Sequence, residues 1–418
     1  MQGSIFPSIR QAFSHVPEND SRANIGPRMF IIALITAMAA DGKKRSIASL
    51  RRCFASSTGL FLARSSFWQR LSSDRLTYFL VKTIQELVLN LTTELNTRTG
   101  ILVKLGVNAV YLLDASSVTL PKGARKYLPA PRSNVIKASA KWHLCWNLFS
   151  GVSEWFCISD GKVHDRNGFP PLEMLKGALI IFDLGYWDYQ LISDLMTRGC
   201  FFLSRVKSKA LIEITGIPSN QQWQFPIGKD LFSLNWAKYR GDVFEMLGSV
   251  SFGDGDCAEM RVIGFWNQSI KNYHWYVTNL PIKGEIIYPL YRIRWQIELV
   301  FKAGKSSLHF ADLTSSNFNI IINLMLASII TNLISQPLSR ATLDKAVEEV
   351  QRSVSVQRAG FVFVHVASEM MNYLMSGRKK DANILRAKLL LYIEEFIDPN
   401  YKNRPTSLQM LGLLLKDD

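Results

Sequence analysis

The chain has 418 residues, of which 48% are hydrophobic and 20% charged, the balance of a globular protein that buries a core. This composition excludes a disordered chain, and the length allows two to four domains of roughly 100–200 residues each. The 49 Lys and Arg residues exceed the 34 Asp and Glu residues by 15, which favours a polyanionic partner such as nucleic acid. A membrane surface or a need for solubility could also explain the surplus.

The five cysteines are scattered and form no CxxC pair, which argues against a zinc site and against a disulfide framework. A reducing cytosol is the natural compartment for such a set. The N-terminus shows no signal-peptide pattern, and the apolar stretch 29–40 is too short to cross a bilayer. A second apolar stretch, 319–334, contains Asn323 and Asn332 and is predicted to be a buried helix. We therefore expect a soluble cytoplasmic protein with no membrane partner.

Residues 1–105 are predicted to form a helical N-terminal DNA-binding domain. Within it, 46–71 suits a helix, a short turn at Gly59 and a second helix, which is compatible with a helix-turn-helix DNA reader. An ordinary helical hairpin fits the same pattern. The side chains expected to face DNA are hydroxyls and cations of the second helix, together with a basic cluster nearby: Arg64, Ser65, Ser66 and Arg70, and Lys43, Lys44, Arg45, Arg51 and Arg52.

Residues 106–207 change to the pattern of a sheet. Apolar runs at 107–116, 140–149, 153–159, 178–183 and 201–207 predict five strands, with helical segments near 172–177 and 187–198. The first three strands are expected to be antiparallel and to enter a partly parallel sheet. We interpret this order as the first part of an α/β, ribonuclease-H-like catalytic core.

The remaining chain divides into three segments. Residues 208–284 contain short β runs between turn signals and are predicted to be a β-rich insertion. Residues 285–339 are predicted to complete the catalytic core, beginning with one helix over 285–310. Residues 340–418 are expected to form a helical C-terminal region that contributes to a dimer.

Two acids stand at the ends of apolar strands. Asp114 ends one predicted strand and Asp183 ends another, and carboxylates there can meet at the edge of an open sheet where ligands bind. A single acid in such a position is more often a turn or cap residue. Two of them in neighbouring strands favour a shared site.

A third acid belongs to a set of four polar residues. Tyr291, Arg294, Glu298 and Lys305 are separated by three, four and seven residues, so on one α-helix they would share a face. Such a face suits phosphate and metal binding, because Arg grips a phosphate with two hydrogen bonds and Lys adds a point charge. A solvated face with internal ion pairs is the alternative.

This spacing resembles the Y-(2)-R-(3)-E-(6)-K signature of the DDE transposases of the insertion-sequence-four family. The surroundings are also similar, with LLDAS at 112–116, FDLGYWDY at 182–189 and YRIRWQIELVFK at 291–302. The resemblance covers roughly residues 40–335. One departure is Ala115-Ser116 after the first acid, where Gly-Thr or Ser-Thr is common in the family.

The resemblance implies that Asp114, Asp183 and Glu298 are catalytic and hold two Mg²⁺ ions, with Mn²⁺ as a substitute. It implies that Tyr291, Arg294 and Lys305 grip DNA phosphates near the cleaved bond. The expected activity is excision of a mobile element at its terminal inverted repeats and transfer into target DNA, by a homodimer associated with the bacterial nucleoid. Close relatives pass through a hairpin end. Two hard divalent cations fit three carboxylates and phosphodiester cleavage.

Several other residues have weaker patterns. Trp266 and Trp275 could stack on a flipped base, although core packing explains them as well. His143 and His164 could touch the site, but lone histidines are more often structural. Trp295 is expected to pack.

Three other functions compete with the transposase. An inactive or domesticated DNA-binding derivative would bind DNA without metal-dependent cleavage. Another ribonuclease-H-like nuclease would leave the long insertion unexplained. An RNA-binding protein with structural acids would keep the three carboxylates far apart in space.

Overall fold

The computed structural model of the chain describes residues 5–20, 24–39, 46–95, 100–131, 135–208, 210–218, 226–236, 243–252, 256–306, 313–346 and 355–396. Lys43, Lys44 and Arg45 of the predicted basic cluster lie outside these residues, as do 397–418 of the predicted C-terminal region.

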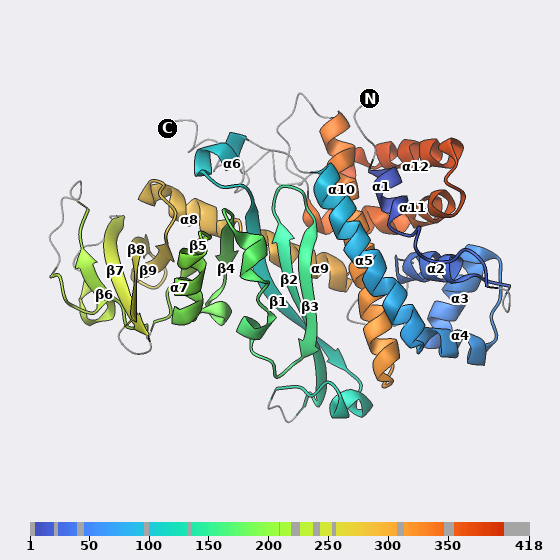
Figure 1. The fold of residues 1–418 in the computed structure, drawn as a ribbon, viewed down its shortest axis with the longest axis horizontal. Coiled ribbons are helices and arrows are strands. Elements are labelled where there is room, and N and C mark those ends of the chain that lie inside the picture. Colours follow the sequence, from blue (N-terminus) through green and yellow to red (C-terminus); the bar gives the residue numbers. More distant parts are fainter. Residues whose placement is uncertain are drawn as a thin grey trace.

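One nine-stranded sheet runs from the centre of the molecule to its left end in Figure 1, in the order β3-β2-β1-β4-β5-β9-β8-β7-β6. Its first five strands are those expected from the apolar runs: β1 Val110–Leu120, β2 Ala138–Asn147, β3 Ser153–Asp160, β4 Leu179–Phe182 and β5 Phe201–Arg205. β1 pairs antiparallel with β2 and parallel with β4, and β4 pairs parallel with β5. The expected mixed α/β sheet is therefore present.

The segment 208–284 does not form a separate β unit. Its strands continue the same sheet, because β9 pairs antiparallel with β5 at Leu203↔Thr278. The added strands are β6 Glu213–Gly216, β7 Phe244–Phe252, β8 Asp256–Asn267 and β9 Asn272–Thr278. An aromatic cluster fills one face of this extension, where the Trp236 and Trp275 ring centroids are 4.7 Å apart.

Short helices connect the strands of the central sheet. The 3-10 turn η1 follows β1, and η2, η3, η4 and α7 lie between β3 and β5. Their bounds are η1 Lys122–Lys126, η2 Asp165–Gly168, η3 Leu172–Leu175, η4 Leu184–Tyr186 and α7 Tyr189–Thr197. A further 3-10 turn, η5 Leu231–Ser233, precedes β7.

The N- and C-terminal helices form one bundle beside the sheet (Figure 1). Its N-terminal helices are α1 Phe6–Gln11, α2 Pro27–Ala39, α3 Ile47–Thr58, α4 Arg64–Leu71 and α5 Asp74–Glu94. The short helix α6 Gly100–Leu105 lies apart from the bundle, above the sheet in Figure 1. The C-terminal elements are α10 Phe318–Ala346, α11 Val356–Ser376, α12 Lys379–Leu391 and η7 Ile393–Phe396. α10 packs against α2, α5 and α11, so one continuous core joins both ends of the chain to the sheet.

The apolar stretch 319–334 is the first part of α10. Among the described residues, the section Phe318–Ser339 is long and apolar enough to span a bilayer, yet 83% of its most apolar window is buried within the protein. Asn323 and Asn332 are buried there, as expected for a core helix.

The predicted helix 285–310 is two helices, α8 Gly284–Arg292 and α9 Trp295–Ser306. Between them the backbone forms bonds from residue i to i−3, including Arg294 N to Tyr291 O at 3.0 Å and Ile297 N to Arg294 O at 3.1 Å. These are the bonds of a 3-10 turn. Pro289 inside α8 also lacks the N–H that a regular helix needs. The expectation of a single helix face was therefore wrong.

Candidate active site

The first two acids lie side by side at the edge where β4 ends. Asp114 lies within β1, which continues to Leu120, so the expectation that it ends its strand was wrong. Leu113 of β1 is the register partner of Phe182 in the parallel strand β4. Asp114 and Asp183 each follow these partners directly, so their backbones are about 4.8 Å apart, the spacing of neighbouring strands. Asp114 Oδ1 accepts a hydrogen bond from the Ala115 N–H at 2.8 Å, and Asp183 accepts one from the Leu184 N–H as the cap of η4.

Glu298 reaches the same edge from α9, and Arg294 joins it to Asp114. The guanidinium donates from Nη1 to Asp114 Oδ2 at 3.1 Å and from Nη2 to Glu298 Oε1 at 2.5 Å. The Arg294 side chain is 14% exposed, whereas those of Asp114 and Glu298 are 19% and 31% exposed. The site is thus half-buried and opens to solvent on the side of the carboxylates.

The electrostatics show that the acids act on one another. Burial raises the pKa of Asp114 to about 6, Arg294 and the Ala115 N–H lower it, and the charges of Asp183 and Glu298 raise it. Burial alone would lower the pKa of Arg294, but Tyr291 and the three acids raise it above its ordinary value. Asp114 and Glu298 therefore bond Arg294 directly, and Asp183 acts on it through its charge.

Tyr291 and Lys305 flank this group. Tyr291 is buried at the end of α8, its hydroxyl is hydrogen-bonded to Arg294, and burial raises its pKa. Lys305, on α9, donates from Nζ to Ser117 O on β1 at 2.9 Å. Burial lowers the pKa of Lys305, and the charge of Asp114 opposes this shift. Arg294 and Lys305 contact β1, Glu298 bonds Arg294, and Tyr291 packs on Tyr276 of β9. The four signature residues therefore lie near one another although they do not share one regular helix.

Sequence reasoning missed a second layer of polar residues behind the acids. Lys141 on β2 donates to Asp165 Oδ1 at 2.7 Å and to Val163 O at 2.6 Å, which fixes η2. Tyr186 of η4 is buried, and burial together with Asp114, Asp165 and Asp183 raises its pKa. Tyr186 follows Asp183 in the FDLGYWDY motif, so its place was readable from the sequence. The Lys141–Asp165 pair had no such signal.

The two histidines lie outside the acidic group. His143 is fully buried on β2, bonds Ser159 Oγ at 2.9 Å, and has a pKa lowered to about 4 by burial. His164 is exposed at the start of η2, where its ring accepts from the Arg166 N–H.

The tryptophans divide differently from the expectation. Trp275 is only 4% exposed and packs on Trp236, so it cannot stack on a base in this conformation. Trp266 is half-buried, packs on Tyr273 and donates to Gln268 Oε1 at 2.9 Å. Trp295 is 58% exposed next to Arg294, so the expectation that it packs was wrong.

The predicted helix, turn at Gly59 and second helix are present as α3 and α4, an arrangement that fits a DNA reader and an ordinary helical hairpin alike. Gly59 ends α3 with φ of 69°, the left-handed conformation that glycine adopts without strain. Arg64 and Ser65 are exposed on α4 and Arg52 is exposed on α3. Arg51 instead donates to Leu62 O at 3.0 Å and lies over the Phe61 ring, so it stabilises the turn.

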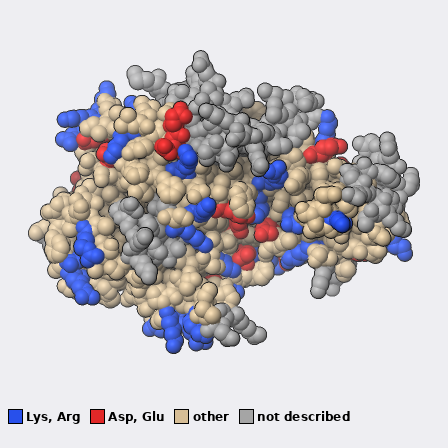
Figure 2. All heavy atoms as spheres, turned by 180° about the vertical axis from the view of Figure 1, so that it is seen from behind, with Lys and Arg blue, Asp and Glu red and all other residues tan. Residues whose placement is uncertain are grey.

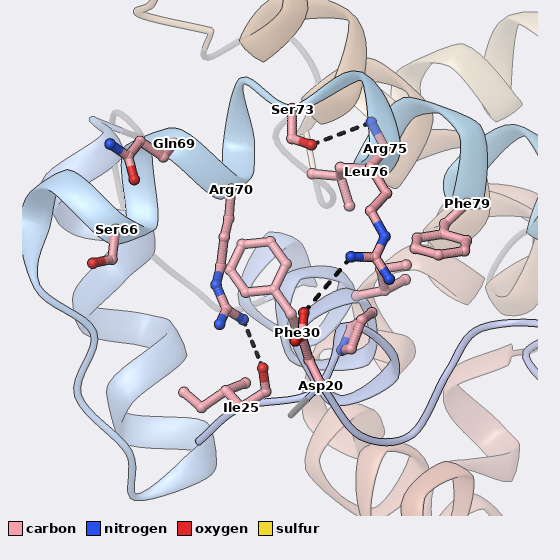
Figure 3. A pocket seen from close by; sticks show the side chains of 12 residues that line it. Asp20, Ile25, Phe30, Ser66, Gln69, Arg70, Ser73, Arg75, Leu76 and Phe79 are labelled. Carbon is pink, nitrogen blue, oxygen red and sulfur yellow. Dashed lines mark hydrogen bonds and ion pairs between the residues drawn. The ribbon is translucent and has the colours of Figure 1, made fainter. Parts of the chain in front are cut away.

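Arg70 also turns away from the outer face of α4. It lines a cavity of about 370 Å³ between α4 and the start of α5, together with Ser66, Ser73 and Arg75 (Figure 3). Its Nη1 donates to Ile25 O at 2.8 Å, and burial lowers its pKa. The expectation that Arg70 faces a DNA groove was therefore wrong for this conformation.

The sequence of the chain matches that of a known protein family. The family described as "Transposase DDE domain" matches residues 106–333, more than half of the chain and all of the sheet. The chain belongs to this family.

Individual relatives agree with the family. The chain is 26% identical over 244 residues to the transposase for insertion sequence element IS231E of Bacillus thuringiensis subsp. finitimus, covering 49% of this chain and 50% of that protein. It is 21% identical over 345 residues to the transposase for insertion sequence element IS1151 of Clostridium perfringens, covering 73% and 72%. The chain spans about half the length of the IS231 relatives it matches.

One solved structure is also similar, the piggyBac transposase in a synaptic complex with hairpin DNA. The TM-score is 0.46 at 10% identity, over 96% of this chain and 84% of that one. A likeness at this level carries no argument about the site.

Proposed function

We propose that this chain is a DNA transposase of the insertion-sequence-four type, with Asp114, Asp183 and Glu298 as its catalytic acids. The observation that carries the proposal is that Arg294 joins Asp114 of β1 to Glu298 of α9, while Asp183 follows β4, the parallel neighbour of β1. The strand order β3-β2-β1-β4-β5, antiparallel for three strands and then parallel, supports a ribonuclease-H-like core.

The donor set suits two Mg²⁺ ions, or Mn²⁺ in their place. Carboxylates are the oxygen ligands that these hard cations prefer. The pKa of Asp114 is raised mainly by burial, and the charges of Asp183 and Glu298 add to the shift, so a cation placed among the acids would stabilise their ionised forms. Among the described residues, no group of three His, Cys, Asp or Glu side chains stands arranged as a metal site, and the Arg294 guanidinium bonds two of the acids. Bound divalent ions would activate the attacking hydroxyl and stabilise the leaving oxygen.

The chain's own residues would then position the DNA. Arg294 presents two N–H donors that a phosphate can accept in place of the carboxylates. Lys305 adds a cation on the exposed side of β1, and Tyr291 holds Arg294 at the end of α8. These groups would keep the scissile phosphate against the acids, which is the contribution that phosphoryl transfer most needs from a protein.

The proposed substrates are the terminal inverted repeats of the element and a target duplex. The positive net charge and the exposed cations of α3 and α4 support DNA binding by the N-terminal helices. We extend the proposal to a homodimer on DNA, because two element ends must be held together, and to the bacterial nucleoid, because the relatives named above come from bacteria.

The test is Glu298→Gln in a purified protein incubated with a plasmid that carries the gene and its flanking DNA. Cleavage at the element ends should fall at least 10²-fold, on the order expected for losing one catalytic group, while end binding by gel shift stays nearly unchanged. Glu285→Gln is the control, because Glu285 is exposed at the start of α8 and has no contact with the site. Equal loss of binding and cleavage would count against a catalytic role, and wild-type binding without metal-dependent cleavage would favour an inactive derivative.

A further inference from the structure

By the β1–β2 arm we mean β1, β2 and the chain that joins them. We propose that the end of this arm is a second DNA contact, which binds the phosphate backbone of the same duplex that the acids cleave. We call this surface the basic tip and define it as Lys122, Arg125 and Lys126 of η1. The inference rests on the proposed function for the identity of the duplex.

Beyond Asp114, the charged side chains of this arm are all positive. Between Asp114 and Glu154 the sequence has no Asp or Glu and six Lys or Arg residues. The three cations of the basic tip are exposed, and none of them forms an ion pair with another described residue. Figure 2 shows Lys and Arg side chains gathered at the lower end of the molecule, where the β1–β2 arm ends in Figure 1. Unpaired cations without nearby acids are what a polyanion attracts.

The tip is held in place by packing. Ala124 and Leu128 are buried beneath it, and the Tyr127 ring lies 5.3 Å from Phe318 at the start of α10. Gly123 lies so close to the chain before α10 that a Cβ there would be 2.6 Å from Ser316 Oγ. Lys126 Nζ lies 4.5 Å from the centre of the Tyr127 ring. Because the turn is fixed, a phosphate contact there orders little additional chain.

The position of the tip links it to the acids. β1 is continuous from Asp114 to Leu120, a distance of about 20 Å for six residues. Lys305 bonds to Ser117 midway along this stretch. Arg294, Lys305 and the basic tip therefore form a line of cations along one rigid strand. A duplex lying on this line would meet the tip about six base pairs from the cleaved phosphate, at 3.4 Å per base pair.

The experiment measures binding of a 30-base-pair duplex of arbitrary sequence as a function of salt, since phosphate contacts do not depend on sequence. The variant is K122Q/R125Q/K126Q in the full chain. Each lost phosphate contact lowers the slope of log K against log salt by about 0.9, so the slope should fall by about 2.7. At 0.1 M salt the variant should bind on the order of 10²-fold more weakly.

The matched control is K379Q/K380Q/R386Q, which removes three exposed cations from α12. It should leave the slope unchanged. In cleavage assays the tip variant should raise KM and leave kcat unchanged, because it touches DNA away from the reacting bond.

An unchanged slope in the tip variant, or equal changes in both triple variants, overturns the proposal, as does a wild-type protein that binds no duplex. Failure of the proposed function gives a different result. In that case the tip variant still lowers the slope, while no variant or wild-type protein cleaves element ends.

Discussion

Arg294 is the residue that organises the candidate site. Its guanidinium bonds Asp114 and Glu298 and contacts Tyr291, so a single positive charge balances acids from a strand and a helix. Asp183 completes the group through its position beside Asp114 in the parallel pair β1–β4. A buried charge of this kind is tolerated because it is paired with opposite charges. The site is therefore held ready by an ion network before any ligand binds.

The first prediction concerns the titration of Asp114. Its pKa is raised from the usual 3.8 to about 6, mainly by burial, so ionising it costs folding stability. Below pH 3.8, the usual pKa and that of the unfolded state, the stability contributed by the neutral carboxyl of Asp114 is fully present. This stability is lost as the pH rises through about 6, where Asp114 ionises in the folded protein. Asp114→Asn cannot ionise and lacks this loss. Between pH 4 and pH 7 the wild type should therefore lose up to about 3 kcal/mol relative to Asp114→Asn.

The measurement is urea unfolding of both proteins at the two pH values without divalent ions. A constant difference between wild type and Asp114→Asn across this range would contradict the raised pKa. Arg294→Ala supplies a second check by NMR, because removing the guanidinium should raise the pKa of Asp114 further.

At the scale of elements, the sequence predicted the central strands well because their signal is local. A buried strand is a continuous apolar run, and an acid at its end is visible without any tertiary information. Asp183 does end its strand, whereas β1 continues from Asp114 to Leu120, so the pair was predicted although the end of the first strand was misplaced. Their convergence with Glu298 followed only from the family resemblance, because nothing in the spacing shows which strand α9 covers.

Features that depend on tertiary packing were not readable. The break between α8 and α9 depends on 3-10 bonding around Ile293, while a helical periodicity continues through it. The attachment of β9 to β5 is a long-range pairing that no local pattern encodes. Arg70 and Arg51 were expected to face DNA, yet both donate to backbone carbonyls inside the helical bundle. Charge in a sequence does not reveal which way a long side chain turns.

The second prediction concerns how α10 holds the N-terminal helices. The buried Asn323 donates to Leu71 O at 2.8 Å and Ser73 O at 3.2 Å, and accepts from Thr77 Oγ1 at 2.7 Å. Asn323→Ala leaves these groups without partners and should lower the free energy of unfolding by about 1–3 kcal/mol. Asn383→Ala, on the exposed side of α12, should change it by less than about 0.5 kcal/mol. Equal stability of the two variants would show that Asn323 does not join α10 to the junction of α4 and α5.

At the scale of the whole molecule, the sheet and the helical bundle share one core, so the exposed cations of α3 and α4 are connected rigidly to the acids. α9 and α11 form this connection, since α9 contacts β1 and α11, and α11 contacts α2 and α10. A DNA duplex held by the helices would therefore be presented to the acids in a fixed register. Under the proposed function, this arrangement would let a chain with a surplus of 15 positive charges direct a small acidic site to one phosphodiester.

The most direct test of the central claim is a crystal of the protein soaked with Mn²⁺ and measured at the manganese absorption edge. We predict anomalous density contacted by Asp114, Asp183 and Glu298, with Arg294 displaced from at least one of the two acids it now bonds. Asp114→Asn crystals, soaked in the same way, should lose this density. Wild-type crystals in which Arg294 still bridges Asp114 and Glu298, with no manganese among the three acids, would contradict the account.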